Sequence, residues 1–156
     1  MIVCGIDPGV TGAVCFIKGK EVTLHKMPDT EEGILDIILN SSLPVSYYLE
    51  KVHASPQMGA STAWTFCENY TYIRTTLKTF FYIDTVQGKK ALGESSFKLV
   101  IPQHWQAAVD CFTGGDKHVS FRRAKELFPD LKGLTLKTAD AALIAYYGWL
   151  KEGKPI

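Results

Sequence analysis

The chain has 156 residues, of which 46% are hydrophobic and 21% are charged, and its formal net charge is +1. This length and composition are typical of a single globular domain, here 1–156, with a substantial core. No stretch approaches the roughly 18 consecutive apolar residues of a membrane-spanning helix, so no membrane association is expected. No basic segment precedes the first apolar run, which argues against a signal peptide and favours a cytoplasmic location.

Turn residues and hydrophobic periodicity predict strands and helices in chain order. The expected strands are 2–6, 13–18, 21–26, 46–49 and 97–101, and the expected helices are 31–39, 62–80, 102–109, 117–128 and 138–150. Strands lead the chain and are then mixed with helices, which indicates an α/β fold with a mixed central sheet flanked by helices. The four cysteines form no CxxC pair, so neither a structural zinc site nor a disulfide framework is supported.

The first candidate functional residue is Asp7, which ends an apolar strand and is followed by Pro8 and Gly9. A carboxylate at the end of a buried strand is costly unless a metal, a proton or hydrogen bonds compensate its charge. Asp7 is therefore a candidate metal-binding or phosphate-binding residue. The alternative is that it only caps the turn, as aspartate often does.

Two further carboxylates stand at the ends of expected elements. Glu50 follows the fourth strand, and Asp140 lies in the first turn of the last helix. Sites in open α/β sheets gather in the crevice beyond the strand ends, where acidic side chains can hold hard divalent cations. Taken alone, Glu50 also suits a surface position and Asp140 suits a favourable helix start. The joint placement of the three residues carries the metal hypothesis.

Several motifs recur here in the order seen in a known family. They are Gly5-Ile-Asp-Pro-Gly-Val-Thr-Gly-Ala13, Leu49-Glu-Lys-Val-His-Ala54, Pro102-Gln-His-Trp105, Ala124-Lys-Glu-Leu-Phe-Pro129 and Ala139-Asp-Ala-Ala-Leu-Ile-Ala145. This ordered set resembles the RuvC family of Holliday junction resolvases, and particularly its bacteriophage-encoded branch. The resemblance implies a ribonuclease-H-like fold, a homodimer and Mg²⁺- or Mn²⁺-dependent nicking of two opposed strands at a four-way DNA junction. It assigns Asp7, Glu50 and Asp140 as catalytic metal ligands.

The chain departs from this family at Lys137, where the family usually has a fourth acidic residue or a histidine about one turn before the final aspartate. Residues three apart on a helix share a face, so Lys137 is a candidate catalytic residue near Asp140. Its ammonium can replace part of one cation's charge or contact the scissile phosphate. Alternatively, the second metal is lost and the protein binds junctions but cuts them poorly, or Lys137 is simply solvated. We favour an active enzyme.

Basic residues for DNA binding are expected in two segments. They are Lys89 and Lys90 in a glycine-bounded loop, and Lys117, His118, Arg122, Arg123 and Lys125 on the helix 117–128. On this helix the side chains of 118, 122 and 125 share one face, which suits phosphate contacts. A plain surface hairpin and a solvated helix face are the respective alternatives.

Aromatic residues of the long helix allow two interpretations. Trp64 and Phe66 follow the loop 54–61, which contains Met58, and an apolar side chain there can stack on an unpaired base. Packing in the core or at a dimer interface is the competing interpretation, which we favour for at least one of the two. Phe66, Tyr70, Ile73 and Leu77 recur at helical spacing, as expected of either a dimer surface or a core face.

Two alternative functions stay open. A junction-binding protein with weak or no cleavage is suggested by Lys137. An ATPase-type relative is suggested by the first hairpin, which resembles the phosphate loop of sugar kinases and actin-like ATPases. Those proteins enclose the nucleotide with a second, duplicated domain, for which 156 residues leave no room.

Overall fold

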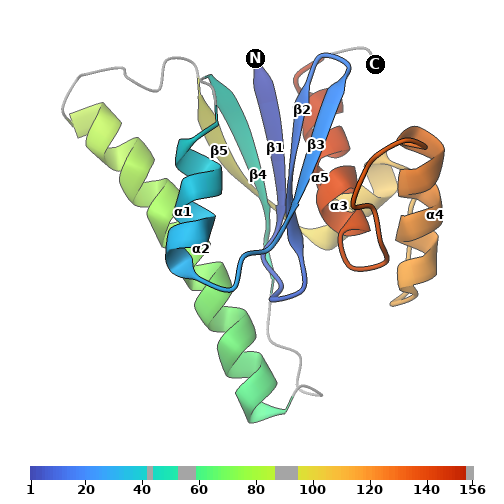
Figure 1. The fold of residues 1–156 in the computed structure, drawn as a ribbon, viewed down its shortest axis with the longest axis horizontal. Helices are drawn as coiled ribbons and strands as arrows, with labels where there is room; N and C mark the ends of the chain where they lie inside the picture. Colours follow the sequence, from blue (N-terminus) through green and yellow to red (C-terminus); the bar gives the residue numbers. More distant parts are fainter. Residues whose placement is uncertain (42–43, 53–58, 87–94, 154–156) are drawn as a thin grey trace.

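The structure is a computed structural model that describes residues 1–41, 44–52, 59–86 and 95–153. A central sheet separates two layers of helices (Figure 1). The strands are β1 (Ile2–Asp7), β2 (Ala13–Lys18), β3 (Glu21–Lys26), β4 (Val45–Glu50) and β5 (Ser96–Val100). The helices are α1 (Glu31–Leu39), α2 (Ala60–Val86), α3 (Pro102–Ala108), α4 (Lys117–Leu127) and α5 (Ala139–Lys151).

The sheet is mixed, with the strand order β3-β2-β1-β4-β5. Strand β2 pairs antiparallel with β1 on one side and with β3 on the other. Strand β4 pairs parallel with β1 on one side and with β5 on the other. The expected α/β fold with a mixed sheet flanked by helices is confirmed. Ile6 pairs with Leu49, so the next residues, Asp7 and Glu50, lie side by side at one edge of the sheet.

Helix α5 packs directly on the central strand β1. A Cβ atom added at Gly5 would lie 2.1 Å from the backbone nitrogen of Ala145 and 2.6 Å from the carbonyl oxygen of Ala141. Only glycine allows this approach, because any side chain would collide with helix backbone. The first turn of α5 is thereby brought toward the edge of the sheet where β1 ends.

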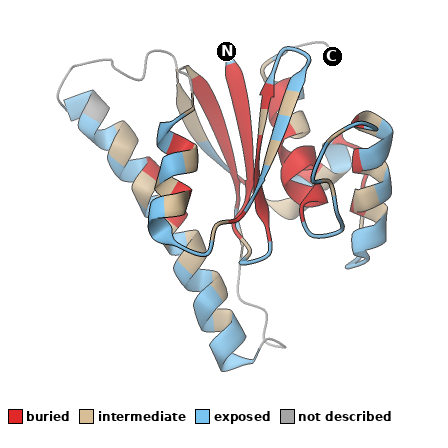
Figure 2. Cartoon of the chain, in the orientation of Figure 1, coloured by how far each residue is buried: buried red, intermediate tan, exposed pale blue. Residues whose placement is uncertain are grey.

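Each face of the sheet has its own core. Residues of β1, β2 and β4 pack with α3, α4 and α5 on one side, and with α1 and α2 on the other. Figure 2 shows the inner strands and most of α5 buried, whereas the first half of α2 is largely exposed. Within α2, the first buried residue is Ile73. The aromatic and aliphatic stripe on this helix thus packs in the chain's own core at Ile73 and Leu77, which are fully buried.

Most predicted boundaries agree with the structure to within one or two residues, but α2 extends six residues past the predicted end at 80. Phe81 explains part of the extension, because its ring contacts Tyr47 of β4 and stacks on Phe97 of β5, with ring centroids 6.3 Å and 6.4 Å apart. Local sequence does not reveal such contacts between distant segments. No helix in the described part of the chain is long and apolar enough to cross a membrane.

Candidate active site

Asp7 is placed by a tight turn between β1 and β2. Its Oδ1 accepts a hydrogen bond from the backbone N–H of Gly9 at 3.0 Å, and the N–H of Gly12 donates to the carbonyl of Gly9 at 2.8 Å. A Cβ atom at Gly12 would lie 2.3 Å from the carbonyl oxygen of Asp7, so the turn requires glycine there. From the other side, Asn69 of α2 donates from Nδ2 to the carbonyl of Pro8 at 2.7 Å.

Glu50 ends β4 beside Asp7 and is held by Trp105. The indole Nε1 of Trp105, a buried residue of α3, donates to Oε1 of Glu50 at 2.9 Å. Trp105 occurs in one of the family-like motifs, but its contact with Glu50 joins residues 55 positions apart and has no local sequence signal. It is a positioning residue that sequence reasoning missed.

Asp140 lies in the first turn of α5 and is paired with Lys117. Its Oδ2 accepts a hydrogen bond from the ammonium of Lys117, the first residue of α4, whereas its Oδ1 is buried and has no hydrogen-bond partner. The sequence predicted Lys117 as a DNA-binding residue of the helix surface. The structure pairs the charge of Lys117 with one of the three candidate metal ligands, and its role in DNA binding stays a prediction.

The three carboxylates influence one another electrostatically. Burial raises the pKa of Glu50 to about 7, and the negative charges of Asp7 and Asp140 add to the rise. Burial likewise raises the pKa of Asp7, assisted by Asp140 and opposed by the Gly9 hydrogen bond and by Lys117. Burial works against the charge of Lys117, but the nearby Asp140, Asp7 and Glu50 hold its pKa above its ordinary value. The structure thus brings the three predicted carboxylates together around one lysine.

A cavity of about 740 Å³ opens beside Asp7, whereas Glu50 and Asp140 do not line it. Asp7 and Lys117 line it together with Lys137, which lies in the turn before α5 and not on the helix itself. The remaining lining comes from the β1–β2 turn, from the first turns of α2 and from Leu136: Gly9, Val10, Thr11, Gly12, Ser61, Thr62, Thr65 and Phe66. A neighbouring cavity of about 710 Å³ shares five of the same lining residues, so the two form one depression across the β1–β2 turn.

The donor set of the cluster suits a hard divalent cation such as Mg²⁺, since it consists of carboxylate oxygens. One of these oxygens, Oδ1 of Asp140, is buried and has no hydrogen-bond partner, so it can accept a bound cation or a hydrogen-bond donor. In the described part of the chain no group of three or more His, Cys, Asp or Glu side chains is arranged to hold a metal ion as it stands. Here the Lys117 ammonium supplies the positive charge at Asp140.

Apart from Lys117, the predicted DNA-binding residues fall into three groups. His118, Arg122 and Lys125 are exposed on α4, opposite the buried Ala124, as the helical spacing predicted. Arg123 is half-buried, with its Nε donating to the carbonyl of Val109 at 2.8 Å, so it fastens α4 to the end of α3. Lys89 and Lys90 lie outside the described residues, as does most of the loop 54–61 with Met58.

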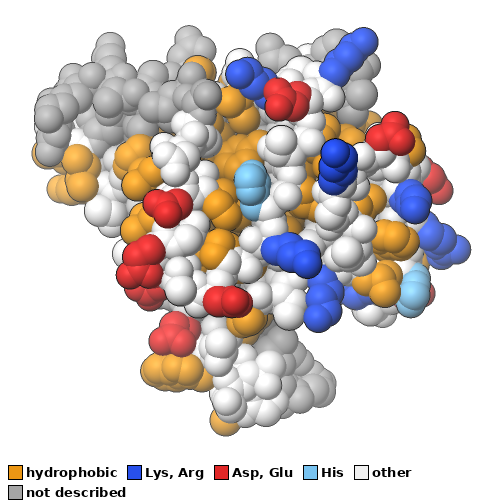
Figure 3. Space-filling model, viewed as in Figure 1, with side chains coloured by type: hydrophobic (Ala, Val, Ile, Leu, Met, Phe, Trp, Pro, Cys, Tyr) orange, Lys and Arg blue, Asp and Glu red, His pale blue; other side chains and the backbone are white. Residues whose placement is uncertain are grey.

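Charge is unevenly distributed over the face shown in Figure 3. Acidic side chains gather over α1 and α2, and Lys and Arg side chains gather toward α4. On α2, Trp64 is 72% exposed, whereas Phe66 is half-buried and lines the cavity beside Asp7. Trp64 is therefore available for contact with a partner, either DNA or protein.

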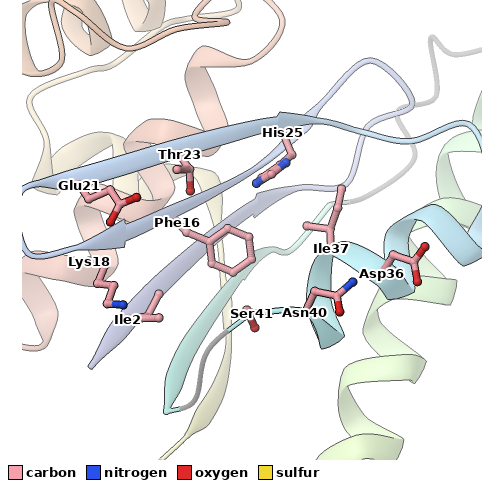
Figure 4. Close-up of a pocket in the computed structure, with 10 residues that line it drawn as sticks. All are labelled: Ile2, Phe16, Lys18, Glu21, Thr23, His25, Asp36, Ile37, Asn40 and Ser41. Carbon is pink, nitrogen blue, oxygen red and sulfur yellow. The ribbon is translucent and has the colours of Figure 1, made fainter.

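A separate hollow of about 420 Å³ lies between the β2–β3 hairpin and α1 (Figure 4). Phe16 and His25 form one wall, with their rings edge to face at 6.0 Å. Its charged lining is mixed in sign, with Lys18 against Glu21 and Asp36. None of the three clustered carboxylates belongs to it, so the candidate active site is the cavity beside Asp7.

We predict that Trp105→Phe removes the hydrogen bond that orients Glu50 and keeps an aromatic ring in the core. Loss of the indole donor costs about 2 kcal/mol of unfolding free energy above pH 7, where Glu50 is ionised, and moves the pKa of Glu50 further up. Urea unfolding at pH 8 and an NMR titration of the Glu50 carboxyl measure the two effects. A double-mutant cycle with Glu50→Ala isolates the pair, because alanine cannot accept the indole hydrogen bond, and a coupling energy near zero would contradict the positioning role.

The class of fold is the ribonuclease-H-like fold of RuvC resolvases, with a mixed five-stranded sheet between helices. Two solved structures of RuvC from Thermus thermophilus match with a TM-score of 0.55 at 16% sequence identity. The match covers 100% of this chain in both cases, and 99% or 100% of the RuvC chain. One of them is RuvC in complex with a Holliday junction substrate. Neither a protein-family model nor a curated protein matches the sequence.

Proposed function

We propose that this protein is a divalent-metal-dependent endonuclease that resolves four-way or otherwise branched DNA junctions by paired nicking. The observation that carries the proposal is the cluster of Asp7, Glu50 and Asp140, which are 8%, 9% and 6% exposed and come from β1, β4 and α5. The RuvC-like fold supports the same function. The bacteriophage-type branch and the cytoplasmic location remain predictions from the sequence.

The proposed role of the carboxylates is to hold Mg²⁺ or Mn²⁺. When bound, the cation activates water and stabilises the leaving oxygen in phosphodiester hydrolysis. Asp7 is fixed by Gly9, and Glu50 by Trp105, so both ligands are oriented before substrate arrives. Lys117 and Lys137 bring positive charge to the same cavity, where a phosphate of the scissile strand would lie. We propose that the scissile strand binds in the depression across the β1–β2 turn.

The direct test compares a synthetic four-way junction with a linear duplex of the same arm sequences, in Mg²⁺, in Mn²⁺ and in EDTA. We expect symmetric nicks on the junction alone, and only with metal. Equal cutting of the duplex would contradict the structure selectivity, and cutting in EDTA would contradict the metal dependence.

One observation favours a second candidate function, a protein that binds junctions without cutting them. The pairing of Lys117 with Asp140 places a lysine on a carboxylate that the nuclease needs for metal. Tight, junction-selective binding with no nicks in either metal would establish this alternative in place of the nuclease.

We predict that α4 contacts the phosphates of a junction arm through its exposed basic face. Arg122→Ala then weakens junction binding about equally for all sequences and reduces the salt-dependence slope by about 1. Lys20→Ala, a change at the exposed β2–β3 turn, serves as the matched control. Titrations across a range of salt concentrations measure both slopes, and an unchanged slope for Arg122→Ala would place DNA elsewhere.

The proposal includes a homodimer, because paired nicks require two active sites. Candidate interface residues on α2 are Trp64, Tyr82 and Val86, which are 72%, 68% and 64% exposed. Sedimentation is expected to give twice the chain mass of 17.3 kDa, and Trp64→Ala is expected to weaken the dimer. A dimer unaffected by Trp64→Ala together with weakened junction binding would instead assign Trp64 to DNA.

A further inference from the structure

The depression across the β1–β2 turn has two halves that differ in chemistry. The half beside Asp7 is polar, because its lining includes two lysines and three hydroxyl-bearing residues of α2. The other half has a volume of about 710 Å³, and the apolar side chains of Met27, Phe121 and Leu134 belong to its lining alone. An apolar hollow therefore adjoins the candidate active site.

The walls of this apolar half are held in place by the fold. Met27 is buried, and its N–H donates to the carbonyl of Gly12 in the β1–β2 turn at 3.0 Å. Phe121 of α4 packs against the core that α5 covers. The turn that carries Leu134 is fixed by Thr138, whose hydroxyl donates to a backbone carbonyl five residues earlier at 2.9 Å. The hollow is therefore formed before any ligand binds.

The charges around the apolar half are all positive among the described residues. Lys26 and Lys137 line it with exposed side chains, and no Asp or Glu in the described part of the chain belongs to its lining. Val10 and Leu136 line both halves and are 49% and 37% exposed. Exposed apolar side chains inside a basic rim suit a ligand that joins an apolar ring to negatively charged groups. A nucleotide, with its base and its phosphates, has this chemistry.

Continuity with the candidate active site indicates that this nucleotide belongs to the strand to be cut. A strand whose scissile phosphate lies beside Asp7 and Lys117 passes the lining that the two halves share, so a neighbouring base can reach the apolar half. Extrusion of a base costs least where stacking and pairing are already disturbed, as they are at the branch point of a junction. We propose that the apolar half binds one nucleobase extruded from the strand beside the scissile phosphate, and that Lys26 and Lys137 bind the adjoining phosphates.

This inference rests on the proposed function, since the base belongs to the strand that the nuclease would cut. It is tested with four-way junctions that carry a single abasic site, moved in steps through the nucleotides around the branch point. Binding of the full chain is measured by fluorescence anisotropy in EDTA, so that no strand is cut. We expect the loss of one particular base to weaken binding about tenfold, because its apolar contacts are lost, and the loss of other bases to have little effect.

Leu136→Asn tests whether that base lies in the apolar half, because it makes one wall polar at nearly constant size and adds no charge. We expect this variant to bind the intact junction about fivefold more weakly. On the sensitive abasic junction we expect no further loss, because the contact is already missing. Val10→Asn is expected to behave in the same way, and it replaces Leu136→Asn if circular dichroism shows that the latter is unfolded. The matched control is Leu39→Asn, at a 54% exposed leucine of α1 that lines neither half, which is expected to bind like the parent chain.

An abasic scan with no sensitive position would overturn the inference, as would Leu136→Asn and Val10→Asn variants that bind intact and abasic junctions in the same ratio as the control. Weaker self-association of Leu136→Asn with unchanged junction binding would assign the hollow to a protein contact instead. A flat scan in a protein that nicks junctions rejects the inference alone. Base-dependent binding by a protein that never nicks rejects the nuclease and leaves the inference standing, and absence of junction binding rejects both.

Discussion

Replacing Asp7 with asparagine is expected to lower the rate of junction nicking by at least about 100-fold in Mg²⁺ or Mn²⁺. The change removes a negative charge and leaves a weak amide ligand in place of a carboxylate. It preserves the turn, because the amide oxygen still accepts the hydrogen bond that Oδ1 now accepts from Gly9. The loss is therefore chemical and not structural. Single-turnover cleavage of a labelled four-way junction measures it.

Junction binding distinguishes lost chemistry from lost structure in this variant. We expect Asp7→Asn to bind the junction as tightly as the parent chain, or more tightly, because a buried negative charge near the phosphates is gone. Asp130→Asn, a change at an exposed aspartate after α4, is expected to leave both binding and nicking unchanged. Full nicking activity in Asp7→Asn would end the proposed mechanism.

The sequence predicted the carboxylate cluster because each member stands at the end of an element. Asp7 and Glu50 end neighbouring parallel strands, and such ends share one edge of a sheet. The partners of these carboxylates could not be predicted in the same way. Lys117 meets Asp140 across 23 positions and Trp105 meets Glu50 across 55, so both contacts depend on how α3, α4 and α5 pack.

Lys137 lines the cavity from the turn before α5 and not from the helix itself. The sequence predicted a helix from residue 138 and placed Lys137 by helical spacing, whereas α5 begins at Ala139 and Lys137 lies in the preceding turn. The residue still lines the cavity beside Asp7, because the hydrogen bonds of Thr138 hold the turn there. Lys137 therefore lies at the cavity for a reason other than the predicted helical spacing, and its catalytic role stays a prediction.

The second large effect is expected at Glu50, where Glu50→Gln should abolish nicking and yet stabilise the metal-free protein. Burial and the charges of Asp7 and Asp140 raise the pKa of Glu50 to about 7, so the folded state holds this proton more tightly than the unfolded chain. Stability is therefore lost as the pH rises from the ordinary glutamate pKa toward 7. A neutral glutamine avoids that loss and still accepts the Trp105 hydrogen bond.

Urea unfolding in EDTA should accordingly give equal stabilities near pH 4 and an advantage of about 2 kcal/mol for Glu50→Gln at pH 8. Glu68→Gln, at an exposed position of α2, should show no such advantage. Added Mn²⁺ should narrow the gap at pH 8, because a cation that binds the folded parent stabilises it by mass action. A variant no more stable than the parent at pH 8 would mean that the Glu50 charge is already compensated. The costly cluster of carboxylates would then no longer point to a cation.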